Sequence, residues 1–374
     1  MRVAIVHEWL QSYAGAERVL EQLIACFPEA DIFATVDVVP EGQRGFLQGR
    51  PVRTSFIQRL PFARTRFRAY LGLMPLAVEQ YDLSGYDVVI SSHHAVAKGV
   101  LTGPDTLHVS YVHSPMRYAW DLQHQYLRQL GLARGVRGAV VRWLLSRLRM
   151  WDARTADGVD VFVANSSHVA RRIRKCYRRE ALVIPPPVDV GTFRIGGARS
   201  DFYLVASRLV AYKRVDLVVE AFAAMPDRRL VVAGDGPEWA RVVKAARGAA
   251  NIAFRGAVAQ DELVRLMQEA RAFVFAAEED FGIALVEAQA CGTPVIALGR
   301  GGARDIVRED DPATGLFFQE QTASAIAAAV RRFEADAGRI SPQACRRNAL
   351  RFTVETFRTR ITELVAREAA AAYG

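Results

Sequence analysis

Short apolar runs alternate with longer amphipathic stretches along almost the whole chain of 374 residues. The runs lack the polar–apolar alternation that marks a half-exposed strand, so we expect strands buried on both faces. The intervening stretches have apolar residues at helical spacing, which predicts crossover helices between parallel strands and an α/β fold. The predicted strands are residues 3–6, 31–34, 88–91, 107–112, 161–164 and 182–184, then 203–206, 230–233, 252–254, 273–276, 295–298 and 316–318.

The pattern occurs twice, and a chain of 374 residues suits two domains. Pro185–Pro187 ends a strand and stiffens the chain, and residues 191–200 hold few apolar side chains, which predicts a hinge there. We predict doubly wound, Rossmann-like domains at residues 1–190 and 191–353, facing each other across a central cleft. A last helix at about 354–374 lies beyond the second sheet, and packing back on the first domain is one option for it. Such sheets bind ligands at the carboxyl ends of their strands, so the residues that follow strands are the candidates for chemistry.

The clearest candidate site follows the predicted strand at 273–276. Glu279 lies on the loop, Gly282 opens a helix, and Glu287 lies a little over one turn inside it. A glycine at this turn lets backbone amides approach an anion, and the amino terminus of a helix favours negative charge. Carboxylates accept hydrogen bonds from sugar and ribose hydroxyl groups. The alternative, a helix-start acid and a surface charge, is less consistent with so apolar a helix.

A basic turn follows the predicted strand at 203–206. Arg208 and Lys213 bracket this turn and are placed to converge on a diphosphate. Charge-assisted hydrogen bonds of this kind are worth ~1.5–3 kcal/mol each, and they stabilise the negative charge that grows on a departing phosphate. The alternative is a solvated basic loop.

Together these segments resemble glycosyltransferase family 4, the retaining, metal-independent enzymes of GT-B fold. Glu279 and Glu287 match the family's E-x7-E pattern, and Ala-Gln-Ala-Cys-Gly-Thr-Pro-Val follows at 288–295. The family's G-R-L-x-x-K pattern is similar to residues 207–213, where Ser207 replaces the usual glycine. The resemblance covers essentially the whole chain.

The resemblance implies a role for each of these residues. Arg208 and Lys213 would hold the donor diphosphate. Glu279 would bind hydroxyls of the transferred sugar and stabilise positive charge at its anomeric carbon, and Glu287 would bind the ribose. The other donor-binding candidates lie on loops of the same edge: Ser207, Gly234, Gly236, Phe281, Gly282 and Ile283.

The first domain contributes two further candidates. Gly15 follows the first strand and starts a helix, which would bring its loop close to the donor phosphate, although Ala14 replaces a second glycine that is frequent in the family. His113 ends a strand, and the family's corresponding histidine contacts the 6-hydroxyl side of the donor sugar; a packed histidine is the alternative. Residues 13–19 and 116–121 resemble the WbaZ-type bacterial mannosyltransferases of O-antigen and exopolysaccharide assembly, which suggests GDP-mannose as the donor.

A net charge of +9 favours anionic partners. Two stretches, Arg53–Arg68 and Arg134–Arg154, combine arginines with apolar residues. At helical period they would suit a membrane surface bearing anionic or polyprenyl-linked lipid, while amphipathic helices with their apolar faces to the core are an equal alternative. Nucleic acid is not expected, because no known binding module is present.

Four cysteines lie far apart without a C-x-x-C pair, which suits a reducing compartment. The first residues read as a strand rather than a cleavable signal, and no run of roughly 18 apolar residues could span a bilayer. We therefore predict a cytoplasmic protein, peripheral at the inner face of the cell membrane if its basic stretches bind lipid. No D-x-D at a strand end and no cluster of metal-ligating residues is present, so we expect neither metal nor cofactor.

The sequence thus predicts a retaining GT-B enzyme that moves a hexose, mannose first, from a nucleotide sugar to a glycan on a lipid carrier. A UDP-sugar is the second choice of donor. One alternative is a GT-B sugar-nucleotide 2-epimerase, which would use several carboxylates and histidines for proton abstraction and elimination. The other is a catalytically idle anion-binding protein at a membrane surface, against which the complete set of Arg208, Lys213, Glu279 and Glu287 argues.

Overall fold

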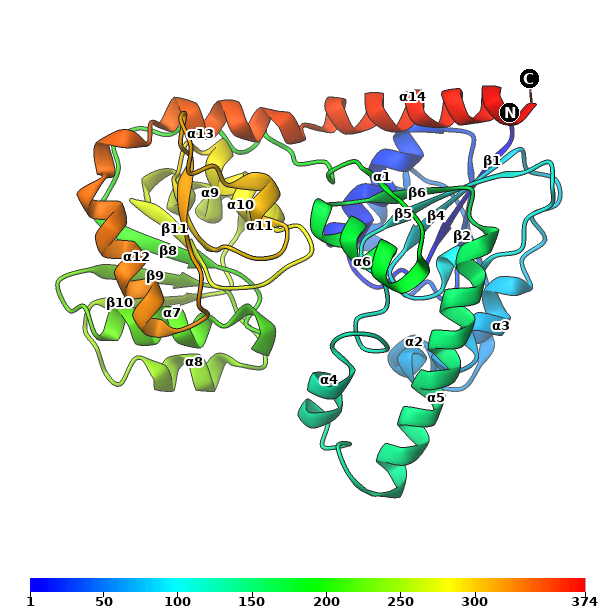
Figure 1. Ribbon diagram of the computed structural model, residues 1–374, viewed down its shortest axis with the longest axis horizontal. Helices are drawn as coiled ribbons and strands as arrows, with labels where there is room; N and C mark the ends of the chain where they lie inside the picture. Colours follow the sequence, from blue (N-terminus) through cyan, green and yellow to red (C-terminus); the bar gives the residue numbers. More distant parts are fainter. Residues whose placement is uncertain (374) are drawn as a thin grey trace. The chain divides into compact units, whose positions relative to one another are not determined.

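The computed structural model describes residues 1–373, apart from the side chains of Ala337 and Tyr373. The chain divides into two compact units, which we call the first and the second unit. The first comprises Met1–Pro187 and the segment from Phe357 onward, and the second comprises Val188–Thr356. Each is a parallel sheet covered by helices on both faces (Figure 1).

Seven parallel strands form the sheet of the first unit, in the order β3-β2-β1-β4-β5-β6-β7. The order reverses direction between β1 and β4, as it does in doubly wound Rossmann sheets. The strands are β1 Val3–His7, β2 Asp31–Ala34, β3 Val52–Thr54, β4 Val88–His93, β5 Leu107–Val112, β6 Val161–Ala164 and β7 Leu182–Val183.

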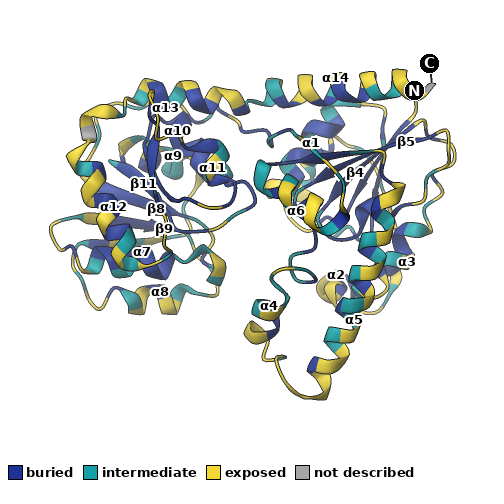
Figure 2. Cartoon of the chain, viewed as in Figure 1, coloured by how far each residue is buried: buried dark blue, intermediate teal, exposed yellow. Residues whose placement is uncertain are grey.

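Helices cover both faces of this sheet. On one face α1 and α14 pack through residues such as Leu23 and Ile361. On the other face α3 and α5 pack through residues such as Val78 and Leu148. The strands are therefore buried on both sides, whereas the outer surfaces of the helices are exposed (Figure 2). The helices are α1 Gly15–Cys26, α2 Ala63–Arg66, α3 Met74–Glu79, α4 Gln123–Gln129, α5 Gly135–Arg154, α6 Ser167–Tyr177 and α14 Val354–Tyr373.

The second unit repeats the design with six parallel strands, in the order β10-β9-β8-β11-β12-β13. Helices α7, α8 and α12 cover one face, and α9, α10 and α13 cover the other. The strands are β8 Phe202–Ala206, β9 Arg229–Ala233, β10 Ile252–Gly256, β11 Ala272–Phe275, β12 Val295–Leu298 and β13 Gly315–Phe318. The helices are α7 Val215–Ala223, α8 Trp239–Ala245, α9 Gln260–Glu269, α10 Ile283–Ala290, α11 Ala303–Ile306, α12 Ala323–Ala335 and α13 Pro342–Ala349.

The predicted architecture of two doubly wound parallel sheets is confirmed, and every predicted strand is present. The sequence reading missed β3, because this edge strand is three residues long and carries the exposed, polar Arg53. The helical interpretation of Arg53–Arg68 is wrong. Pro61 interrupts this stretch, and short 3-10 turns flank the single turn of α2. By contrast, Arg134–Arg154 forms one long helix, α5.

Within residues 1–373, every helix is too short or too polar to cross a lipid bilayer. The longest two are α5 and α14. Residues of α14 from Phe357 onward belong to the first unit, where Arg358 donates a hydrogen bond to Gln22 of α1 at 2.8 Å.

A buried carboxylate fixes the reversal point of the first sheet. Glu8 directly follows β1, and its carboxylate accepts hydrogen bonds from four consecutive backbone N–H groups, from His94 to Ala97, at 2.7–3.1 Å. Burial raises the pKa of Glu8, but the hydrogen bond from His93 and the backbone N–H groups outweigh it, so the pKa lies well below the ordinary 4.5. The loop after β4 is thereby tied to the end of β1.

A second buried polar cluster anchors the carboxyl-terminal end of α5. Lys98 Nζ lies 2.9 Å from Asp152 Oδ1, and both side chains are fully buried. The carboxylate of Asp152 also accepts hydrogen bonds from Trp120 Nε1 at 2.7 Å and from the Tyr177 hydroxyl at 3.0 Å. Because removal of one partner leaves an uncompensated buried charge, the cluster holds α5 firmly to the body of the first unit.

We predict that Glu8→Gln destabilises the first unit by at least about 2 kcal/mol at neutral pH, because hydrogen bonds to a charged acceptor are lost and an amide cannot accept from four N–H donors. The folded pKa lies below the unfolded pKa, so this stabilisation is present above pH 4.5 and is lost as the pH falls below that value. Urea unfolding of both proteins at neutral pH and below pH 4.5 measures the difference.

The exposed Glu363→Gln is the matched control, and it should change the free energy of unfolding by less than about 0.5 kcal/mol. A Glu8→Gln effect of equal size at both pH values would contradict the assignment.

Candidate functional site

The candidate residues of the second unit gather where its strand order reverses, between β8 and β11. The loop after β8 carries Arg208 and Lys213, and the loop after the neighbouring β11 carries Glu279. Lys213 Nζ forms an ion pair with Glu279 Oε1, and only 16% and 15% of the two side chains are exposed. Reversal points are where doubly wound sheets usually bind their ligands, so this pair lies at the expected place for a site.

Aromatic rings surround the ammonium group of Lys213. Its Nζ lies 5.6 Å from the ring centres of both Tyr212 and Phe275. Such rings attract a cation by roughly 0.5–2 kcal/mol each, which helps to hold the ammonium beside Glu279. Arg208 is exposed on the same loop. The structure thus brings Lys213 and Glu279 into contact. It places cationic groups that can donate hydrogen bonds to a phosphate beside a carboxylate that can accept them from hydroxyl groups.

Asp216 holds this basic loop in place, and the sequence reading missed it. Its buried carboxylate accepts hydrogen bonds from Arg214 Nε at 3.2 Å and from Arg241 of α8 at 2.8 Å. The loop that carries Lys213 is therefore tied to α8. Acidic residues are frequent in the first turn of a helix because they interact favourably with the helix dipole. The sequence therefore does not distinguish an acid that also links two arginines, as Asp216 does.

Gly234 permits the loops after β8 and β9 to touch. Its φ is +129°, and a Cβ at this position would overlap the carbonyl group of Ser207. Gly236 approaches the carbonyl group of Leu209 in the same manner. A larger residue at Gly234 would push away the loop that carries Lys213, so these glycines position the site through the backbone.

Helix α10 begins after Gly282, its N-cap, as the sequence predicts. Phe281 packs its ring into the core, which leaves only its backbone for a ligand, and Ile283 is half-buried in the first turn. Glu287 is 6% exposed within α10. The alternative of a solvated surface charge at Glu287 is therefore excluded.

The loop after β12 completes this edge of the second sheet. Gly302 donates its N–H to the carbonyl of Glu279 at 2.8 Å, and a Cβ at Gly302 would overlap the backbone of Phe281. The backbone of Glu279 is thus fixed by a direct contact from the neighbouring strand's loop.

Histidines dominate the corresponding edge of the first unit. Ser92 Oγ lies 3.0 Å from His7 Nδ1 and 2.9 Å from His113 Nε2. A hydroxyl has one proton to donate, so at least one of these rings donates to it. Burial lowers the pKa of His94 to about 4, and burial, with His94 and His7 nearby, lowers the pKa of His113 well below 6.5. Both rings are therefore neutral at pH 7 and suit hydroxyl groups rather than phosphate.

Gly15 is exposed at the first position of α1. The carboxylate of Glu17 accepts the N–H of Ala14 at 3.1 Å, and its other oxygen lies 3.8 Å from His7 Nε2. An acidic side chain already neutralises part of this helix terminus, so phosphate binding at Gly15 stays a prediction.

The sequence reading missed His7, Glu8 and His94 at this edge. Each lies at or directly after the end of β1 or β4. The signal available in the sequence was the polar residues at the ends of two buried strands, His7 and Glu8 at the end of β1 and His94 after β4. They become informative only when β1 and β4 are known to be neighbours, which the strand order decides.

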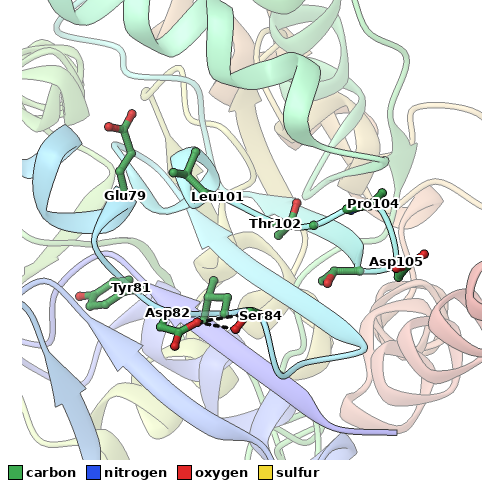
Figure 3. A pocket seen from close by; sticks show the side chains of 11 residues that line it. Glu79, Tyr81, Asp82, Ser84, Leu101, Thr102, Pro104 and Asp105 are labelled. Carbon is green, nitrogen blue, oxygen red and sulfur yellow. Dashed lines mark hydrogen bonds between the residues drawn. The ribbon is translucent and has the colours of Figure 1, made fainter.

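A cavity of about 470 Å³ lies at the opposite edge of the first sheet (Figure 3). Its lining comes from the segments before β4 and β5, where Ser84 donates two hydrogen bonds to Asp82 Oδ1, at 3.1 Å and 2.6 Å. Glu79, Asp82 and Asp105 give it an acidic lining that would repel phosphate. Among residues 1–373, no group of three or more His, Cys, Asp or Glu side chains could hold a metal ion.

Two family models match adjacent parts of the chain. The model described as Glycosyltransferase Family 4 matches residues 13–192, and the model described as Glycosyl transferases group 1 matches residues 197–352. The first match covers most of the first unit and ends a few residues inside the second, and the second match includes Lys213 and Glu279.

Curated relatives include the D-inositol 3-phosphate glycosyltransferases of Mycobacterium tuberculosis and Mycobacterium bovis. They are 30% identical over an alignment of 230 positions, and the match covers 54% of this chain and 48% of each relative. The chain thus spans about half the length of the curated relatives it matches.

Solved structures share the fold over nearly the full chain. Sucrose-phosphate synthase from Thermosynechococcus elongatus has a TM-score of 0.74 at 18% identity, covering 99% of this chain and 100% of that structure. Anabaena HepE in complex with UDP has a TM-score of 0.71 at 16% identity, covering 98% and 100%. Both halves of the chain are thus similar to glycosyltransferase family models, the first half to that of family 4, and the two sheets have the GT-B fold of these solved structures.

Proposed function

We propose that the protein transfers a hexose from a nucleotide sugar to a glycan acceptor, with retention of the anomeric configuration and without a metal ion. The observation that carries the proposal is the ion pair of Lys213 with Glu279 at the reversal point of the second sheet, with Arg208 on the same loop. A nucleotide sugar presents a diphosphate beside a ring of hydroxyl groups, so it needs cations and a carboxylate side by side.

The proposed division of labour follows from the charges of the reaction. Negative charge grows on the departing diphosphate, where Lys213 and Arg208 donate hydrogen bonds. Positive charge grows at the anomeric carbon, where Glu279 stabilises it and accepts from sugar hydroxyls. The acceptor oxygen bonds to the anomeric carbon on the face from which the phosphate leaves, and the acceptor proton passes to a phosphate oxygen. This front-face step rests on the family resemblance.

The roles of the remaining candidates are proposed on the same basis. Glu287 would accept from the ribose hydroxyls, and its burial in α10 would make that hydrogen bond stronger than one in water. His113 would contact hydroxyls of the donor sugar, for which its neutral ring is suited. Gly15 would lie near the donor phosphate.

GDP-mannose is the favoured donor, and a UDP-sugar is the second choice. The favoured donor rests on the resemblance of residues 13–19 and 116–121 to WbaZ-type mannosyltransferases. Support for the second comes from the fold relative HepE, which has been solved with UDP and with UDP-glucose. The proposed acceptor is a glycan on a polyprenyl carrier in O-antigen or exopolysaccharide assembly, which would place the enzyme at the cytoplasmic face of the cell membrane.

Replacement of either member of the ion pair should abolish most of the transfer. We expect Lys213→Met and Glu279→Gln each to lower kcat by ~10²–10³, because each removes one charge that acts mainly in the transition state. Steady-state transfer assays give kcat and KM separately.

Two exposed residues of the second unit serve as matched controls for this pair. Lys244→Met, on α8, and Glu278→Gln, beside the site residue, both change exposed side chains and should leave kcat within about twofold. Wild-type rates in Lys213→Met or Glu279→Gln would remove the basis of the proposal.

A donor panel should identify the nucleotide sugar. We expect GDP-mannose to bind more tightly and to be hydrolysed faster than UDP-glucose, UDP-galactose or GDP-fucose, with the α-anomer as the first product. Calorimetry measures binding, and NMR of the product identifies the anomer. An epimer formed from donor alone would instead favour a sugar-nucleotide 2-epimerase.

Chelation should leave the activity unchanged. Because Lys213 and Arg208 would neutralise the diphosphate, transfer in EDTA should match transfer in Mg²⁺ or Mn²⁺ within about twofold. A loss of activity in EDTA that Mn²⁺ restores would show that the cationic loop is insufficient.

A further inference from the structure

Helix α5 has an apolar stripe on its solvent side. Val136, Val140, Trp143, Arg147 and Met150 follow one another at spacings of four and three residues, which places them on one face of the helix. Val136 is 81% exposed, Trp143 is 61% exposed and Val140 is 59% exposed. Single exposed apolar residues are ordinary, but a stripe of this kind marks an interaction surface. We call these five residues the outer stripe.

The core cannot account for the outer stripe, because another face of α5 already serves it. Leu145 and Leu148 are buried against the first sheet, and Asp152 joins the buried cluster with Lys98. The alternative stated for this helix, an apolar face to the core and arginines to water, explains the inner face only.

Helices α4 and α5 form a hairpin whose tip is exposed (Figures 1 and 2). Arg142 NH1 donates to the carbonyl of Ala133 at 3.2 Å, and Arg149 NH1 donates to the carbonyl of Ala119 at 2.7 Å. These two arginines hold the hairpin together. The tip adds Leu130, which is 67% exposed.

Arginines without acidic residues characterise the stretch that carries the outer stripe and the stretch packed against it. Residues 122–151 contain six arginines, residues 42–78 contain seven, and neither stretch contains Asp or Glu. The two stretches pack together in the first unit, where Leu144 of α5 lies against Gly72. Their arginines exceed the net charge of the whole chain, which is +9, so the remainder of the protein is net negative.

We propose that the outer stripe and the arginines around it dock the first unit on the surface of an anionic lipid bilayer. Interfacial helices bury Trp and aliphatic side chains at the boundary between head groups and acyl chains. The exposed arginines Arg134, Arg137 and Arg154 then contact lipid phosphates. Each of these contacts raises the affinity for the bilayer by a factor of up to about ten. Arg147, whose guanidinium lies 5.5 Å from the ring centre of Trp143, reaches the head groups while its stem lies along the apolar surface.

Charge decides between a bilayer and a second copy of the chain. Two outer stripes in contact would bring two arginine-rich surfaces together, and like charges at an interface oppose association. An anionic bilayer offers the opposite charge and an apolar layer at the same time. This inference concerns binding to lipid and does not depend on the proposed transfer reaction.

Flotation with lipid vesicles tests the proposal on the intact protein. Vesicles of phosphatidylcholine with phosphatidylglycerol should carry the protein, and vesicles of phosphatidylcholine alone should carry it at least roughly tenfold less well. The double variant Val140→Ser/Trp143→Ser should weaken binding to the anionic vesicles by roughly tenfold or more. Arg137→Glu should weaken it by a similar factor and make the remaining binding less sensitive to salt.

Matched variants separate this surface from general effects of charge and polarity. Val243→Ser replaces an exposed valine on α8 and is the control for the double variant. Arg331→Glu, on α12, changes the net charge by as much as Arg137→Glu does. Both control variants should bind vesicles within about twofold of the wild type. Thermal unfolding and donor hydrolysis should be unchanged in all four variants, which keeps a failure here distinct from a failure of the proposed function.

Three outcomes would overturn the proposal. The first is wild-type protein that does not float with anionic vesicles. The second is a Val140→Ser/Trp143→Ser variant that floats as well as the wild type. The third is a wild-type dimer in sedimentation equilibrium that this variant dissociates without any change in flotation, because the outer stripe would then be a contact between copies of the chain.

Discussion

Close backbone contact between loops is the constraint on which the carboxyl edge of the second sheet depends. Gly234 lets the loop after β9 touch the loop after β8, and Gly302 lets the loop after β12 touch the loop after β11. These contacts fix the backbone of the two loops at the positions from which Lys213 and Glu279 form their ion pair. The site is therefore assembled by glycines, which have no side chain, and Asp216 adds an electrostatic tie through Arg214 and Arg241.

The first unit uses a different device at the equivalent place. There the loop after β4 wraps its N–H groups around the carboxylate of Glu8. This loop geometry is of the kind that binds an anion, but the chain supplies the anion itself. The neutral rings of His94 and His113 lie beside it. The two units thus share a topology and differ in chemistry, since one edge is cationic and the other offers uncharged hydrogen-bonding groups.

Helix α5 illustrates how one sequence pattern can serve two surfaces. Apolar residues occur on more than one side of it, so its amphipathic character is weak in sequence, although its arginines are conspicuous. Burial separates the residues that form the core from those of the outer stripe. The buried cluster of Lys98 and Asp152 makes this possible, because it holds the end of the helix while the hairpin tip extends into solvent.

The sequence by itself determined the two parallel sheets, the positions of nearly all their strands, and the segments that carry Arg208, Lys213, Glu279 and Glu287. Buried strands leave a strong local pattern, and turn residues mark their ends, so these features need no knowledge of distant contacts. Edge strand β3 escaped notice because one half-buried and two exposed residues leave no such pattern. Tertiary structure alone decided that Lys213 meets Glu279, that Asp216 braces their loop, that Glu8 lies within the loop after β4, and which face of α5 reaches solvent. Each of these depends on which strands and helices become neighbours, and that information is spread over residues far apart in the chain.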